Sequence, residues 1–330
     1  MTRRDFVQLP AGAPLMDDHR AAQAPAPGAA RLPTIYEAVE AVARELYWRA
    51  LKDIPPDVRA ALRGGLQSER QSGNATAGQV LFTILENIRT ADEQDTLVCQ
   101  DTGLPIYKIL VGGTLQLDIP ELKERIRRGC QRATAEYPLR SNTVHPLTRK
   151  HTGTNTGQGI PVIMLDFIPG TDHIEVHMAP KGSGSENMSF LRMLNPEEGR
   201  QGIKKFVLDC VVASGAQPCP PVVVGVGLGG TSDLAVQLAK EASTFRPIGS
   251  SNGDPDVAQL ERELLGLINQ TGIGPQGLGG ATTALAVHIE WAHTHITQNP
   301  VAVNMQCWRG ERAHAVITPE GKVTYSHGAL

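Results

Sequence analysis

The stretch Pro221–Val226, Pro-Val-Val-Val-Gly-Val, is followed after a glycine-rich turn by Ser232–Ala242, Ser-Asp-Leu-Ala-Val-Gln-Leu-Ala-Lys-Glu-Ala. A short run of β-branched residues without polar alternation predicts a strand that is buried on both faces. The second segment, Ser232–Ala242, is predicted to form a helix. A buried strand that leads directly into a helix is typical of an α/β fold.

The segments on either side continue this alternation. The pattern predicts strands at 106–111, 162–168 and 174–178, helices at 120–137, 197–213 and 256–269, and a tail from Ala284 that is mainly strands. We expect three earlier helices: the first begins at about Thr34, the second runs through Val58 and Leu62, and the third covers 76–89. Together they are expected to form an N-terminal helical layer. The sequence thus predicts an α/β fold with mixed sheets flanked by helices. A division into two lobes near Gln217 is an open alternative.

Composition and charge exclude several classes of function. The chain has 330 residues, of which 41% are hydrophobic, so it can bury a sizeable core. Its net charge is −3 and its aromatic content is 4%, which argues against a nucleic-acid partner. No run of about 18 apolar residues occurs, so we expect no membrane partner.

The first residues differ in composition from the rest. Residues 1–32 are rich in Ala, Pro and Gly and are expected to be a disordered leader, with one functional domain over 33–330. Arg3 and Arg4 are typical of an export signal, but the apolar segment that such a signal needs does not follow them. We therefore expect a cytoplasmic location.

The five cysteines are widely spaced, which suits a reducing cytoplasm better than a disulfide framework. Cys130 lies in a charged helix and Cys210 on an apolar helix face, so both are expected to be buried structural residues. Cys99, Cys219 and Cys307 lie beside turn-forming or polar residues instead. Three thiolates can hold three irons of a cubane and leave the fourth iron open. Spacing alone does not separate this from burial, because no Cys-x-x-Cys occurs.

The glycine-rich turn after the buried strand offers a different function. Gly225-Val-Gly-Leu-Gly-Gly230 matches the dinucleotide fingerprint between a strand and a helix. That fingerprint also needs an acidic residue about twenty positions further on. The segment 244–249 contains none, and the next acid is Asp254. Close helix–strand packing is therefore the favoured role of these glycines over NAD binding.

Six polar or glycine-rich motifs occur in a fixed order. They are Cys-Gln-Asp-Thr-Gly at 99–103, Gly-Thr-Asn-Thr-Gly at 153–157, Lys-Gly-Ser-Gly-Ser-Glu-Asn at 181–187, Cys-Pro-Pro at 219–221, Gly-Ile-Gly-Pro-Gln-Gly at 272–277 and Val-Ala-Val-Asn-Met-Gln-Cys-Trp at 301–308. Together they resemble the iron–sulfur class I fumarases. The chain is most similar to the separate α subunit of two-subunit fumarase and L-tartrate dehydratase, over residues 34–330.

The resemblance implies a [4Fe–4S] cluster bound by Cys99, Cys219 and Cys307, with the two lobes around it. It also implies catalytic roles for Asp101 and His295, and substrate contacts from Gln100, Arg140, Gly184 and Asn187. These residue types suit the reaction. An arginine offers a bidentate fork to a carboxylate, and a positioned acid can deliver a proton to a leaving hydroxyl. His293 is an alternative to His295, and the role of Lys181 is open.

The resemblance also implies a partner and a substrate class. A separate β subunit is expected to supply the base and complete the site, in an α2β2 assembly that acts on a small dicarboxylate. The loop at 181–187 resembles fumarases, so we expect interconversion of fumarate and L-malate, a step of the tricarboxylic acid cycle. An L-tartrate dehydratase α subunit is the alternative within the family. An NAD-dependent oxidoreductase and an iron–sulfur regulatory module are alternatives of other classes.

Overall fold

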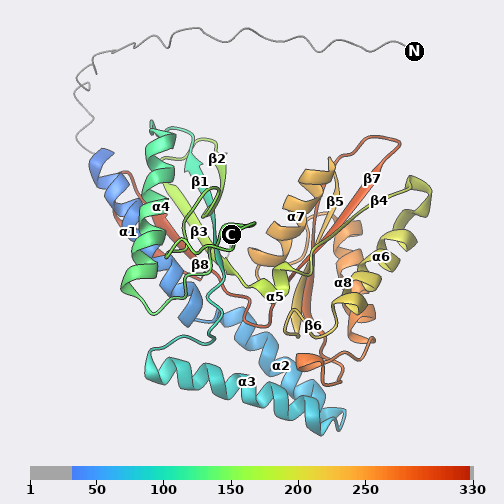
Figure 1. Cartoon of the computed structure of the whole chain (residues 1–330). Coiled ribbons are helices and arrows are strands. Elements are labelled where there is room, and N and C mark those ends of the chain that lie inside the picture. Colours follow the sequence, from blue (N-terminus) through green and yellow to red (C-terminus); the bar gives the residue numbers. More distant parts are fainter. Residues whose placement is uncertain (1–31, 328–330) are drawn as a thin grey trace.

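A computed structural model describes residues 32–327 of the chain. The predicted leader at 1–32 thus lies outside the described residues, apart from its last position. The described part contains two mixed β-sheets flanked by helices, so the predicted α/β class is confirmed. Figure 1 shows the two sheets side by side, with a pair of helices beneath them.

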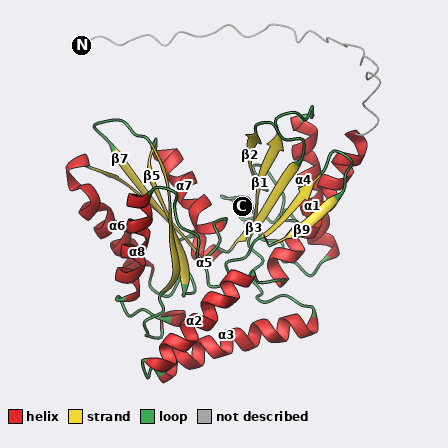
Figure 2. Ribbon diagram, turned by 180° about the vertical axis from the view of Figure 1, so that it is seen from behind, coloured by secondary structure: helices red, strands yellow, loops and turns green. Residues whose placement is uncertain are grey.

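The first sheet has the strand order β2-β1-β3-β8-β9. Its strands are β1 (Leu104–Gly112), β2 (Val162–Ile168), β3 (Ile174–Lys181), β8 (Ala313–Ile317) and β9 (Val323–Ser326). β1 and β2 are parallel and the other neighbours are antiparallel. Two helices, α1 (Leu32–Lys52) and α4 (Ile119–Glu136), bury their apolar stripes against one face of this sheet (Figure 2).

The second sheet has the order β4-β7-β5-β6. Its strands are β4 (Phe190–Leu194), β7 (Asn299–Gln306), β5 (Val222–Gly229) and β6 (Ala284–Ala292). Helices α6 (Gly199–Ser214) and α8 (Pro255–Asn269) share a core with one face, and α7 (Ser232–Thr244) packs on the other face. The strand–helix pair that opened the sequence analysis is thus the centre of this lobe.

The glycines of β5 allow α7 to approach closely. A Cβ atom on Gly225 would lie 2.1 Å from the carbonyl oxygen of Ala239, and one on Gly227 would lie 1.9 Å from that of Ala235. Neither position has room for a side chain, because the helix backbone occupies the space. The favoured role of these glycines in helix–strand packing is confirmed.

The sequence predicts one layer of N-terminal helices, but these helices separate into two groups. α1 belongs to the first lobe, whereas α2 (Pro56–Gln71) and α3 (Ala75–Gln94) lie together beneath both lobes (Figures 1 and 2). Their own apolar cluster explains the difference: Val58, Leu62 and Leu81 are fully buried with each other and not with α1.

The chain passes between the sheets at two places. It leaves the first sheet after β3 through the short helix α5 (Ser183–Glu186), and it returns after β7 through residues 307–312. Gln217, where the sequence suggested a boundary, therefore lies inside the second lobe. Single turns at η2 (Pro196–Glu198) and η3 (Pro275–Gly277) complete the described elements. The two crossings and the segment between α3 and β1 contain all or part of three of the six motifs, those at 99–103, 181–187 and 301–308.

Candidate active site

The three candidate cluster cysteines come from three different loops at the junction of the lobes. Cys99 follows α3, Cys219 precedes β5, and Cys307 follows β7. The backbone N–H of Trp308 donates to the carbonyl of Cys219 at 3.2 Å, which joins the second and third loops. Cys219 has a φ of 56°, a left-handed conformation that side chains rarely adopt and that is most often retained at functional sites.

The electrostatics of the thiols place them in one neighbourhood. Burial raises the pKa of Cys219, and the charge of Cys99 raises it further. Burial also raises the pKa of Cys307 to about 11, while the nearby Arg309 opposes this rise. Because a thiolate is the form that binds iron, a cation or a metal is needed to keep the buried sulfur of Cys307 charged, whereas Cys99 is half-buried and Cys219 is exposed.

Arg309 supplies a buried positive charge at the thiols. Its side chain is 4% exposed, and its Nη1 atom lies 2.5 Å from Oε1 of Glu311, whose side chain is fully buried. Burial acts to lower the pKa of Arg309, but the charges of Glu311, Cys307 and Cys99 raise it overall. Its Nη2 atom donates to the carbonyl of Asp101 at 2.9 Å. This arginine therefore links the Cys99 loop to the Cys307 loop.

Asp101 is held by backbone donors from both sides of the junction. Its Oδ1 atom accepts from the N–H of Gly103 at 3.0 Å, and its Oδ2 atom accepts from the N–H of Ser183 at 3.2 Å. A Cβ atom on Gly182 would lie 2.9 Å from Oδ2, so a glycine is needed there for the carboxylate to keep this position. The carboxylate is thus fixed two residues from Cys99.

A pocket of about 320 Å³ opens beside this carboxylate. Its polar lining includes Asp101, Asn142, Lys181, Glu186 and Asn187. Such a volume suits a small ligand, and the mixture of carboxylates, amides and one ammonium group suits a polar one.

Lys181 is the buried cation of this pocket. Its side chain is 2% exposed, and Nζ donates to Ser185 Oγ at 2.7 Å and to the carbonyl of Met305 at 2.5 Å. Burial lowers its pKa to about 8, while Glu186, whose Oε2 atom lies 3.7 Å from Nζ, raises it. The structure thus places a residue whose role the sequence left open in the wall of the pocket.

Of the other predicted substrate contacts, Asn187 lines this pocket, whereas Arg140, Gln100 and Gly184 do not. Arg140 has an exposed side chain. Its backbone N–H donates to Thr102 Oγ1 at 3.2 Å, so the main chain of Arg140 lies beside the Cys99 loop. Gln100 is exposed next to Cys99. Gly184 packs against the Cys219 loop, because a Cβ there would lie 2.6 Å from the carbonyl oxygen of Gln217.

His295 is not brought to the pocket within this chain. It is exposed in the turn between β6 and β7, where Nδ1 lies 2.8 Å from Thr297 Oγ1. The eight residues of β7 separate this turn from Cys307, which corresponds to roughly 25 Å. His293 is exposed in the same turn. The catalytic role of His295 stays a prediction.

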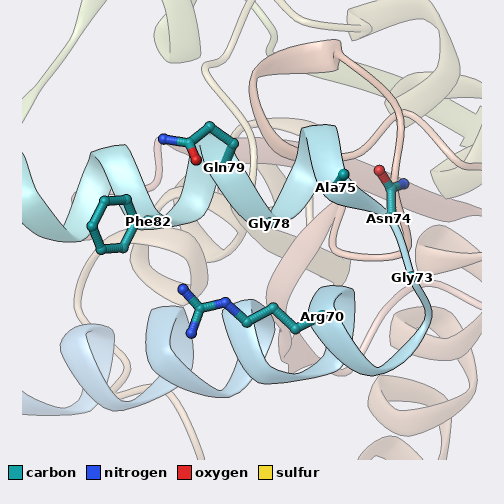
Figure 3. A pocket seen from close by; sticks show the side chains of 7 residues that line it. All are labelled: Arg70, Gly73, Asn74, Ala75, Gly78, Gln79 and Phe82. Carbon is teal, nitrogen blue, oxygen red and sulfur yellow. The ribbon is translucent and has the colours of Figure 1, made fainter.

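The remaining cysteines and a further pocket lie away from this site. Cys130 and Cys210 are buried in helices, as predicted, and burial raises the pKa of each to about 12. A pocket of about 410 Å³ between α2 and α3 is lined by Arg70, Asn74 and Phe82 among others (Figure 3). Its lining contains neither a thiol nor a carboxylate. In residues 32–327, no helix has the length and apolar character needed to cross a membrane.

Comparison with known proteins decides the family. A profile described as fumarate hydratase (fumerase) matches residues 40–316. The chain belongs to the fumarate hydratase family. It is a hydro-lyase of this family, so the resemblance seen in the six motifs is confirmed.

Two relatives illustrate this membership. A Methanocaldococcus jannaschii protein named "Putative L(+)-tartrate dehydratase subunit alpha" is 43% identical over 281 residues, which cover 84% of this chain and 97% of that protein. The L(+)-tartrate dehydratase subunit alpha of Escherichia coli K12 is 34% identical over 270 residues, which cover 80% of this chain and 88% of that protein. The resemblance of this chain to proteins of the α-subunit type is thus confirmed.

Proposed function

We propose that this chain is the α subunit of a hydro-lyase that interconverts fumarate and L-malate, with a [4Fe–4S] cluster on Cys99, Cys219 and Cys307. The observation that carries the proposal is the convergence of three separate thiol loops on one junction, next to the fixed carboxylate of Asp101 and a small polar pocket.

The residues at the junction fit such a cluster. Three thiols are the donor set that a cubane with one open iron requires. Arg309 adds a buried cation beside the sulfurs, and the charges of Cys307 and Cys99 both act on it. A cluster with a net negative charge would be stabilised by this cation. When bound, the cluster supplies a Lewis acid for a substrate carboxylate and hydroxyl.

The polar residues of the chain can perform the remaining parts of the reaction. In the dehydration direction, the base of the β subunit would take a proton from the carbon next to the hydroxyl-bearing carbon. A proton from the Asp101 carboxyl would move to the leaving hydroxyl, which departs as water as the double bond forms. Lys181 and Arg140 place positive charge where negative charge develops on the substrate carboxylates. Gln100, Asn187 and the backbone at Gly184 would orient the diacid by hydrogen bonds. Each role depends on the substrate entering the pocket beside Asp101.

A separate β subunit completes the proposed site. The relatives carry the name subunit alpha, which supports a partner chain for this one. We propose an α2β2 assembly in the cytoplasm, in which the β subunit supplies the base. A symmetric assembly also offers a way for His295 of one chain to reach a site outside its own lobe.

Fumarate and L-tartrate remain the two candidate starting diacids. The loop at 181–187, which resembles fumarases, favours fumarate, and it forms one wall of the pocket. The names of the relatives favour L-tartrate. L-Tartrate carries one hydroxyl more than L-malate, and a polar pocket can discriminate strongly on such a difference.

The test is turnover by the anaerobically reconstituted complex of this chain and its β subunit. We expect loss of fumarate absorbance with L-malate as the product, and a kcat/KM for L-tartrate at least about 100-fold lower. Preference for L-tartrate by the same margin would replace fumarate by the second candidate. Turnover of neither diacid by a complex that contains its cluster would refute the proposal.

A further inference from the structure

We infer that Glu175, His177 and His314 form a second metal site, for a divalent cation of the Zn²⁺ type, in the first lobe. His177 on β3 and His314 on β8 are directly paired across the two antiparallel strands. Glu175 lies two positions from His177, so its side chain shares the same face of the sheet. This face is opposite to the one that α1 and α4 cover, because Ile174, Val176 and Met178 point into that core.

The distances suit a tetrahedral ion. The Nε2 atom of His177 lies 3.4 Å from Glu175 Oε2, and that of His314 lies 3.7 Å from the same oxygen. Ligands at the usual zinc distances of about 2.0–2.2 Å are about 3.3–3.6 Å apart along a tetrahedral edge. All three ligand atoms lie within 4.8 Å of one another. Small side-chain shifts therefore suffice for coordination, with water in the fourth position.

The imidazole nitrogens that face the carboxylate are buried and unsatisfied. The side chain of His177 is 5% exposed, and that of His314 is 11% exposed. Neither Nε2 atom has a hydrogen-bond partner of good geometry. An unpaired buried polar atom costs about 1–3 kcal/mol, so two of them side by side require an explanation. A shared cation satisfies both at once.

The surrounding contacts prepare these atoms as ligands. Ser326 Oγ on β9 lies 3.0 Å from Nδ1 of His314, and a hydrogen bond from Nδ1 leaves the lone pair of Nε2 for a metal. The ring of His173 lies 3.2 Å from Oε1 of Glu175, which leaves Oε2 for the ion. Metal-ligating histidines and carboxylates commonly have outer partners of this kind.

The charges around Glu175, His177 and His314 favour a bound metal ion over protonation of the two histidines. Burial and the neighbouring ring of His314 together lower the pKa of His177 to about 3, and burial lowers the pKa of His314, so both imidazoles stay neutral near pH 7. The ring centroids are 4.2 Å apart, which disfavours two imidazolium charges. Lys108, which faces His177 from β1, is paired with Glu241 at 2.9 Å, so its charge is largely compensated.

A metal at this place would act on the strand that leads to the pocket. Lys181 lies four residues after His177 on β3, about 13 Å further along the strand. The ion would join β3 to β8, whose preceding loop contains Glu311 and Arg309. We therefore expect a structural role, separate from the thiol loops.

The test is Co²⁺ binding by the full chain with its iron–sulfur cluster in place, so that the three thiols are already occupied. We expect one equivalent of Co²⁺ with the absorption of a tetrahedral N/O site and without thiolate charge-transfer bands, displaced by Zn²⁺. His177→Gln and His314→Gln should each weaken binding at least about 100-fold. The matched control is His293→Gln, an exposed histidine in the other lobe, which should bind normally.

A milder variant covers the case in which a ligand variant does not fold. Ser326→Ala keeps all three ligands and should weaken Co²⁺ binding about 10- to 100-fold by loss of the outer hydrogen bond. Zn²⁺ should also raise the melting temperature of the unmodified chain and not that of His314→Gln. Failure of the chain to bind Co²⁺, or equal binding by the ligand variants and the control, would overturn the inference.

Discussion

Substitution of Asp101 by asparagine is the sharpest test of the proposed chemistry. Asp101→Asn keeps the size of the side chain and an acceptor for Gly103, but it places an amide where Oδ2 accepts from Ser183. The loss of this single hydrogen bond costs about 1 kcal/mol of unfolding free energy. Domains of ordinary stability, about 5–15 kcal/mol, remain folded after such a loss.

The effect on the rate should be much larger. A positioned acid typically contributes about 10²- to 10⁴-fold, which corresponds to about 2.7–5.4 kcal/mol of barrier. We therefore expect kcat of the reconstituted complex to fall by at least about 100-fold, at unchanged cluster content and nearly unchanged urea midpoint. The assay is fumarate absorbance under anaerobic conditions, with iron and sulfide measured on the same sample.

A matched carboxylate separates this effect from a general one. Asp209→Asn removes an exposed partner of Lys205, a pair of the kind that contributes only about 0.3–0.5 kcal/mol. Its kcat should equal that of the unmodified complex. If Asp101→Asn kept more than a tenth of kcat with a full cluster, Asp101 would not be the proton-transfer group.

Four further substitutions test the fold and the electrostatics. Arg309→Met should lower the unfolding free energy of the chain without cluster by about 3–5 kcal/mol in urea, because Glu311 is left buried and unpaired; a loss below about 1 kcal/mol would contradict this. His288→Asn should flatten the pH dependence of stability. Burial lowers the pKa of His288 from 6.5 to about 4, so its contribution is present above pH 6.5 and is lost as the pH falls toward 4. Urea titrations at pH 7.5 and 5.5 should therefore differ by about 1.3 kcal/mol more in the unmodified chain than in the variant, and equal slopes would contradict the assignment. Gly227→Ala should destabilise the chain by about 3 kcal/mol, because the new Cβ atom collides with α7. Gly266→Ala should stabilise the chain by about 0.5–1 kcal/mol, because Gly266 lies in a helix and a Cβ atom there has no neighbour within 4 Å. Thermal melts that rank the two variants in the opposite order would refute this packing.

The regular elements could be predicted from the sequence because each carries a local signal. The strand at 162–168 has the predicted limits, and the helix at 256–269 begins only one residue earlier, at Pro255. β4 was missed because Phe190–Leu194 is mostly exposed at the edge of the sheet and lacks the alternation of a half-buried strand. The split of the N-terminal helices depends on which apolar faces meet, and periodicity does not contain that information.

The candidate site was predictable in its motifs and not in its supporting charges. The sequence singled out Cys99, Cys219 and Cys307 as exceptional, and the structure brings their loops together. Arg309 and Glu311 were missed because arginine and glutamate are exposed by default, and only the packing of the return crossing buries them. The pairing of two histidines across β3 and β8 depends on strand register, which a single sequence does not fix.

The central claim is that three distant thiols share one cubane. Mössbauer spectroscopy of the anaerobically reconstituted chain tests it most directly. We predict the signature of a [4Fe–4S] cluster in the unmodified chain and in Cys130→Ser and Cys210→Ser, and its loss when serine replaces any one of Cys99, Cys219 and Cys307. A cluster that survives one of these three replacements, or no cluster in the unmodified chain, would contradict the account.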